Sequence, residues 1–311
     1  MNARSGLILA AVTSCVLPIK CLAVSFVRQN PDQDAVRSIL DNSREVVRTA
    51  AIQAHRFETD HVIVHIDQDL LTTEAEQEFA RTIERIFVAT SAFLQRGFDE
   101  TSRKTRKPAY YLTNRAGISH AEATQLFLNA RRVIPSPAIA IHETVHLLLM
   151  KNPESPRNRS DLTPEEDARL TATSGMWLAE GFAGYVGYEL APTLNMAPDR
   201  LFVTGDKGTV DGEARQWLRD ARGTKVLTFV GAHGVPDGLV ADRPNVAAPF
   251  YVLGQSFVKY LVQQTDMAVI ARLYEEHFDG TRSIEEDVTR ITGRSLAQWR
   301  TEWLQAIGAG R

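Results

Sequence analysis

Cysteine is scarce in this sequence: among 311 residues only Cys15 and Cys21 occur, and both lie close to the N-terminus. The rest of the chain therefore has no cysteine for a disulfide framework, a thiol nucleophile or a thiolate metal ligand. Any metal site there has to use nitrogen and oxygen ligands. The fold has to be held by the burial of apolar side chains rather than by disulfide bonds.

The N-terminus has the pattern of a secretory signal peptide. Arg4 precedes a mostly apolar stretch over residues 7–19, which is shorter than the roughly 20 apolar residues that a membrane-spanning helix needs. The small residue Ala23 offers a cleavage site. We therefore predict a signal peptide over residues 1–23 and an exported protein, periplasmic or secreted. The alternative is a buried N-terminal helix or a retained membrane anchor.

The sequence also lacks an excess of basic charge. Its formal net charge is −3, and it becomes −5 when residues 1–23, which contain two basic and no acidic residues, are removed. A mildly acidic chain has no electrostatic footprint for nucleic acid, so we expect no nucleic-acid partner. We also expect no stable membrane span after removal of the leader. The content of 44% apolar and 23% charged residues is ordinary for a globular protein.

Hydrophobic patterns predict an α+β fold. Alternation over residues 61–67 and an aromatic run over residues 108–113 predict strands. Apolar residues at helical spacing predict helices over residues 32–57, 72–97, 120–131, 139–150, 176–190, 212–221, 250–264, 268–278, 283–292 and 296–307. Strands therefore occur only early in the chain. We predict an N-terminal α/β subdomain with a sheet over residues 24–138 and a mostly helical subdomain over residues 139–311. The segment 191–249, rich in glycine and proline, is a candidate lid.

The strongest motif is His142-Glu143-Thr144-Val145-His146. On a helix, residues four apart lie one turn apart on the same face, so both imidazoles can reach one metal ion. Glu143 lies beside them and can take a proton from a water at the metal. This is the HExxH arrangement of zinc sites. The alternative is a pair of core histidines that are satisfied by hydrogen bonds alone.

A catalytic zinc site needs three protein ligands and an open fourth position. Glu180 lies among apolar residues in the stretch Trp-Leu-Ala-Glu-Gly-Phe-Ala over residues 177–183. An unpaired carboxylate would be costly to bury there, so we predict that Glu180 is the third ligand. The alternative is an acid that faces solvent. Three glycines are expected to let the ligand helices approach closely: Gly181, Gly184 and Gly187.

Together, residues 142–146 and 177–183 resemble the two motifs of the gluzincin zinc metallopeptidases, in the peptidase MA-like group. A looser likeness extends over roughly residues 60–311. The resemblance implies a zincin-like fold and one Zn²⁺ ion bound by His142, His146 and Glu180. It also implies that Glu143 is the general base in the hydrolysis of peptide bonds in a peptide or protein substrate.

Two further residues are candidate hydrogen-bond donors to the transition state. Tyr251 falls where the families that this chain resembles place a tyrosine that stabilises the oxyanion, a role suited to a phenol. Its alternative role is ordinary aromatic packing at the start of a helix. His233, in an Ala-His-Gly loop, is the second candidate, and its alternative is an exposed loop histidine.

The sequence departs from relatives of this group in two places. No segment like the Gly-Ala-Met-Glu-Asn of aminopeptidase N precedes His142, which favours an endopeptidase over an aminopeptidase. Gly184 lies four residues after Glu180, where thermolysin-type enzymes carry an aspartate. The alternatives to a peptidase are an exported zincin-fold binding protein without proteolysis and a zinc hydrolase acting on a non-peptide substrate, such as an ester or an epoxide.

Overall fold

The computed structural model describes residues 43, 45–50, 52–98, 107–116, 119–122, 124–149, 175–198, 209–228, 230 and 243–308. The predicted signal peptide over residues 1–23 and the candidate donor His233 lie outside these residues. The same is true of much of the segment 191–249, so its role as a lid stays a prediction.

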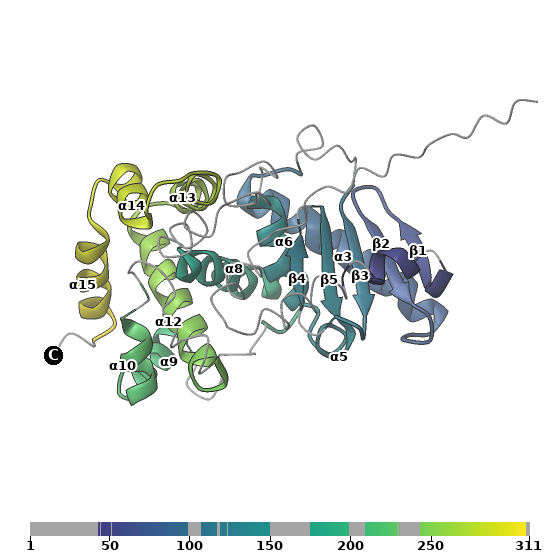
Figure 1. Cartoon of the computed structure of the whole chain (residues 1–311), viewed down its shortest axis with the longest axis horizontal. Helices are drawn as coiled ribbons and strands as arrows, with labels where there is room; N and C mark the ends of the chain where they lie inside the picture. The colour runs from purple at the N-terminus through teal and green to yellow at the C-terminus, as the bar shows by residue number, and fades with distance from the viewer. Residues whose placement is uncertain are drawn as a thin grey trace, which may run out of the picture.

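A five-stranded mixed sheet forms the N-terminal part of the described fold (Figure 1). Its strands are β1 (Ala54–Glu58), β2 (Ile63–Asp67), β3 (Ala109–Thr113), β4 (His120–Glu122) and β5 (Gln125–Asn129). They lie in the order β1-β2-β3-β5-β4. The three central strands β2, β3 and β5 run parallel, whereas β1 and β4 pair antiparallel at the two edges. The strands predicted over residues 61–67 and 108–113 are confirmed as β2 and β3.

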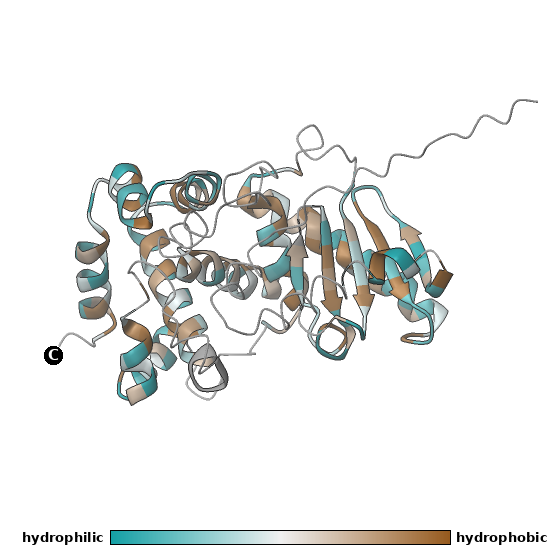
Figure 2. Ribbon diagram, viewed as in Figure 1, coloured by the Kyte–Doolittle hydropathy of each residue, from teal (hydrophilic) through white to brown (hydrophobic). Residues whose placement is uncertain are grey.

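The central strands bury side chains on both faces of the sheet. Tyr110 and Leu112 of β3 join the main core together with the apolar face of α3 (Thr73–Leu94). Tyr111, between them, packs on the opposite face with Val46. Strands with parallel neighbours are normally covered on both sides. In Figure 2 the central strands β2 and β5 are accordingly mostly brown and β3, with its two tyrosines, is paler, whereas the edge strand β1 is mainly teal.

The helix predicted over residues 120–131 is wrong. These residues form β4, β5 and the short helix α5 (Ala130–Val133). Leu126, Phe127 and Leu128 of β5 are all buried, and β5 pairs with β3 along its whole length. An apolar run that is buried on both faces cannot be told from a buried helix by periodicity, so the pairing with β3 decided its conformation.

The helix predicted over residues 32–57 is wrong at its C-terminal end. Residues 45–50 are helical, but Ala54–Glu58 form strand β1, which pairs antiparallel with β2. Two residues of β1 are half-buried and the rest more exposed, so its side chains carried little strand signal. Its strand conformation depends on hydrogen bonds to β2, which the local sequence pattern does not indicate.

The C-terminal part is mostly helical, so the α+β class is confirmed. The helices are α6 (Ile139–Leu149), α8 (Met176–Leu190), the 3₁₀ turn η2 (Ala191–Leu194), α9 (Val210–Trp217), α10 (Ala221–Leu227), α12 (Arg243–Gln264), α13 (Met267–Asp279), α14 (Ile284–Thr292) and α15 (Leu296–Ala306). α6 contacts the sheet and α3 as well as α8, and α8 packs along α12 (Figure 1). Among the described residues, every helix is too short or too polar to cross a lipid bilayer.

Candidate metal centre

The helix α6 carries the HExxH motif and is almost entirely buried. Its apolar residues pack into the main core between the sheet and α8. Thr144 at its middle donates a hydrogen bond to the Ala140 carbonyl at 2.6 Å and lies 3.0 Å from the Tyr110 hydroxyl of β3. The contact with Tyr110 joins α6 to the sheet, and His142 and His146 lie on the side of α6 that faces Glu180 of α8.

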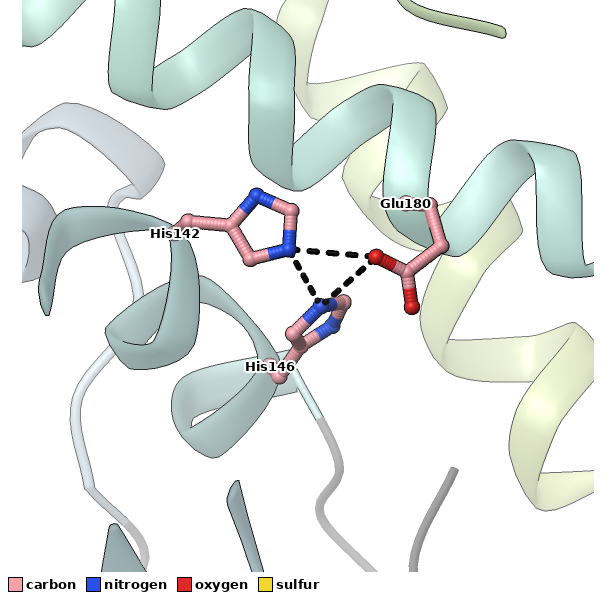
Figure 3. Close-up of side chains that lie close together, drawn as sticks. All are labelled: His142, His146 and Glu180. Atoms are coloured by element: carbon pink, nitrogen blue, oxygen red, sulfur yellow. Dashed lines mark hydrogen bonds and ion pairs between the residues drawn. The ribbon is translucent and has the colours of Figure 1, made fainter. Parts of the chain in front are cut away.

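The structure brings the three predicted ligands together, as Figure 3 shows. The Nε2 atoms of His142 and His146 lie 3.1 Å apart. Oε2 of Glu180 lies 3.2 Å from His142 Nε2 and 3.8 Å from His146 Nε2. The three side chains are only 17%, 6% and 13% exposed. Two nitrogen atoms and one carboxylate oxygen therefore converge from two helices on one point.

This donor set fits a single metal ion. Bonds of about 2.0–2.1 Å in tetrahedral geometry place neighbouring ligand atoms about 3.3 Å apart, close to the separations found between these three atoms. All three atoms carry lone pairs when the imidazoles are deprotonated at Nε2. A cation between them would therefore relieve the repulsion of lone pairs held at such short range. The group can hold a metal ion, and its chemistry suits zinc among other metals that accept imidazole and carboxylate.

The pKa values of the two carboxyl groups near this point are shifted in opposite directions. Burial would raise the pKa of Glu180, but hydrogen bonds from His142 and His146 outweigh it and hold that pKa well below its ordinary value. Burial raises the pKa of Glu143, and the charges of the two histidines offset this only in part. The ionised form of Glu180 is thus favoured beside the two imidazoles, whereas burial disfavours the ionised form of Glu143.

Glu143 is the second acid of the candidate metal centre. Its side chain is 7% exposed and belongs to the same helix as the two histidines. Burial and the charges of neighbouring side chains shift its pKa. Glu143 is therefore a nearly buried carboxyl group that comes directly after His142, one of the three candidate ligands.

Tyr251 lies on α12 beside the candidate metal centre. The centroid of its ring is 6.4 Å from that of His142, with the two planes tilted by 45°. Its side chain is half-buried and packs against the main core. The structure therefore places the ring of Tyr251 next to that of His142, one of the predicted ligands.

Of the three glycines expected to let the ligand helices approach closely, the most crowded one faces α12 and not the other ligand helix, α6. A Cβ atom on Gly181 would lie 2.5 Å from the carbonyl oxygen of Gly254 in α12, so no side chain fits there. Gly184 faces Gln255 with less crowding, and a Cβ on Gly187 would make only ordinary contact at 3.9 Å from His142 N. Gly181 thus sets the distance between α8 and α12 next to Glu180.

Sequence reasoning missed two polar residues of α13 that hold the ligand helices. The Tyr274 hydroxyl lies 2.9 Å from Nδ1 of His146, and Nε2 of His277 accepts a hydrogen bond from the Gly175 amide at the start of α8. Both side chains are completely buried. The available signal was their place on the apolar face of an amphipathic helix, where a buried polar group needs a partner.

No protein-family model matches the sequence, and no curated protein sequence matches it. The likeness to gluzincin metallopeptidases therefore rests on the two motifs alone.

Proposed function

We propose that this protein is a zinc-dependent metallopeptidase that hydrolyses peptide bonds, acting as an endopeptidase. The observation that carries the proposal is the convergence of His142, His146 and Glu180 beside the buried carboxylate of Glu143. A metal site that was purely structural would not need a buried base next to it. The HExxH and Trp-Leu-Ala-Glu-Gly motifs support the same assignment and favour zinc over other metals.

The residues of the chain divide the chemistry among them. When bound, zinc supplies Lewis-acid activation of a water molecule and of the scissile carbonyl. Glu143 accepts the proton of the attacking water and passes it to the leaving amine. Burial raises the pKa of Glu143, which moves it toward the range in which one group can both accept and return a proton. The Tyr251 phenol donates a hydrogen bond to the oxygen on which negative charge develops.

The decisive experiment combines metal analysis of the purified protein with a peptide-library cleavage profile. We expect one zinc ion per chain in both the wild type and Glu143→Gln, and a loss of hydrolysis in the variant of at least about 10²-fold. Glu76→Gln is the matched control, because Glu76 is a buried carboxyl that pairs with His55 of β1 and does not belong to the candidate metal centre. Full activity in Glu143→Gln would overturn the mechanism.

The same profile separates the rival functions. Zinc binding without cleavage of any peptide would favour an exported binding protein with this fold. Cleavage of esters or epoxides but not of peptides, still dependent on Glu143, would favour a zinc hydrolase that acts on a non-peptide substrate. Cleavage restricted to the first peptide bond would make the protein an aminopeptidase.

We infer further that the protein acts after export. The proposal rests on the leader pattern over residues 1–23. N-terminal sequencing of the protein from an expressing host is expected to start at Val24. A chain that starts at its first residues and stays in the cytosol would contradict it.

A further inference from the structure

Helix α13 touches both helices that carry metal ligands, through two buried side chains one turn apart. Tyr274 contacts His146 on α6, and His277, three residues later, contacts the amide of Gly175 immediately before α8. Tyr274 and His277 are completely buried, and His146 is 5% exposed. One face of α13 therefore reaches two segments that the chain places far apart.

Tyr274 is placed to select the protonation of the His146 ring. For Nε2 of His146 to offer a lone pair toward His142 and Glu180, the proton of the neutral ring has to be on Nδ1. Nδ1–H then donates to the Tyr274 oxygen, which lies 2.9 Å away. A partner on the second ring nitrogen fixes the orientation of a metal-binding imidazole and raises its basicity. Tyrosine takes this place here, although a carboxylate or a carbonyl is more usual.

His277 is placed to hold the first turn of α8. Its Nε2 accepts from the Gly175 N–H at 3.0 Å, so the ring proton is on Nδ1, which donates to Asp287 Oδ2 at 3.0 Å. This hydrogen bond satisfies an amide donor at the start of α8, where intrahelical partners are missing. Glu180 follows within the second turn of that helix.

Two arginines compensate the buried negative charge of Asp287 in the His277–Asp287 pair. Asp287 on α14 accepts a hydrogen bond from Arg282 at 2.8 Å and another from Arg290 at 3.0 Å. Both His277 and Asp287 are 0% exposed, whereas the two arginines reach solvent. A buried carboxylate with three donors is a strong anchor for the ring that it holds. The anchor thus runs from the surface of α14 to the start of α8.

We propose that α13 positions the metal ligands, with Tyr274 orienting His146 and His277 anchoring the start of the helix that carries Glu180. Tyr274 and His277 are positioning residues, since they act through groups that would touch the metal. The proposal rests on the metal site of the proposed function. Its two parts are therefore tested by one measurement that needs the metal and one that does not.

The first measurement is zinc affinity, by competition with a chelator, in Tyr274→Phe and in Tyr110→Phe. Both variants remove a buried tyrosine hydroxyl that bonds to α6, but Tyr110 bonds to Thr144 and not to a ligand. Zinc affinity is expected to fall about 10- to 100-fold in Tyr274→Phe and to change less than about 2-fold in Tyr110→Phe. The visible spectrum of the cobalt-substituted protein is expected to shift in the first variant alone. An equal effect of the two variants, or no effect of Tyr274→Phe, would overturn the role of Tyr274.

The second measurement is amide hydrogen exchange at Gly175 in the metal-free protein. Exchange is expected to be roughly 10-fold faster in His277→Leu, and His277→Gln should restore most of the protection because its amide oxygen can accept the same bond. If His277→Leu does not fold, Asp287→Asn takes its place, with an expected acceleration of about 3-fold. Unchanged exchange would overturn the role of His277.

The two measurements also separate this inference from the proposed function. Wild-type protein that binds no zinc would refute the metallopeptidase and the role of Tyr274, while the exchange measurement would still decide whether His277 anchors α8. Wild-type protein that binds zinc, with variants that neither weaken binding nor speed exchange, would refute only the positioning by α13.

Discussion

The two helices that carry the candidate ligands are held in different ways. α6 is oriented by hydroxyl groups, because Tyr110 bonds to Thr144 and Tyr274 bonds to His146. α8 is located by the absence of side chains, because Gly181 lies against the backbone of α12. α6 is therefore held by hydrogen bonds to its side chains. α8 is held by backbone packing beside Glu180 and by one hydrogen bond to the amide that precedes it.

This difference suits what each helix would present to a metal ion. α6 would supply two imidazole rings, each of which has to turn the correct nitrogen toward the ion, so orientation matters most. α8 would supply one carboxylate, whose position depends on where its neighbours, including α12, place the helix. A hydrogen bond depends on direction, and the loss of one costs little stability. A backbone contact that is already tight cannot make room for an added atom by a small rotation. We therefore expect α8 to tolerate added volume poorly and α6 to tolerate the loss of a single hydroxyl well.

The largest expected effect on stability is that of zinc itself. A zinc ion would join α6 to α8, so that the two helices would no longer be held only in their different ways. Free zinc at about 1,000 times its dissociation constant should stabilise the metal-free wild type by about 4 kcal/mol, because only the folded state assembles His142, His146 and Glu180. Urea unfolding with and without buffered zinc measures this. His146→Ala is expected to lose nearly all of the gain. An equal gain in that variant would show that zinc binds elsewhere.

The second prediction tests the packing of α8 directly. Gly181→Ala is expected to lower the free energy of unfolding by about 3 kcal/mol, because its Cβ would lie 2.5 Å from the Gly254 carbonyl oxygen. Gly187→Ala is the matched control in the same helix, where the nearest atom is 3.9 Å away. Alanine favours a helix over glycine by up to about 1 kcal/mol, so this control should be neutral or stabilising. Equal losses in the two variants, measured by denaturant unfolding, would contradict a specific contact at Gly181.

The third prediction concerns the anchor at the start of α8 and its dependence on pH. Burial would raise the pKa of Asp287, but hydrogen bonds from His277, Arg282 and Arg290 lower it from 3.8 to about 2. The stabilisation is therefore complete above pH 3.8 and is lost as the pH falls through about 2. Between pH 5 and pH 2 the wild type should lose about 2 kcal/mol more than Asp287→Asn. Parallel stability curves for the two proteins would show that Asp287 contributes no such anchor.

The smallest expected effect is on α6. Tyr110→Phe should cost about 1 kcal/mol, because it removes one buried hydrogen bond while Thr144 keeps its bond to the Ala140 carbonyl. Denaturant unfolding beside Gly181→Ala gives the comparison. A loss as large as that of Gly181→Ala would mean that α6 is as intolerant as α8, and the contrast between the two helices would fail.

Local pattern was a good guide where an element is long and amphipathic or nearly all apolar. The helices α6 and α8 and three of the four closing helices follow from their apolar spacing, and they were predicted almost to their ends. The fourth, α12, begins at Arg243, seven residues before the predicted start at residue 250. The strands β1 and β5 were misread as helix, because a short strand takes its hydrogen bonds from another segment. For such segments the partner, and not the pattern, decides the conformation.

The residues of the candidate site also differ in whether a local pattern could place them. The spacing of four between His142 and His146 requires only a helix, so those two ligands and Glu143 could be placed from the motif. The buried acid Glu180 could be proposed, but its reach depends on how α8 packs. Tyr274 lies 128 residues from His146, and no local signal pairs them.

The sequence by itself therefore determined the α+β class, the cysteine-free composition after residue 21 and the one-turn geometry of the two histidines. These depend on composition and on the geometry of a single helix. The tertiary structure decided that Glu180 lies against the two histidines, that Gly181 lets α8 pack closely on α12, and that α13 contacts both His146 and the amide before α8. Contacts between segments far apart in the chain depend on close packing of the whole core, which no local stretch encodes.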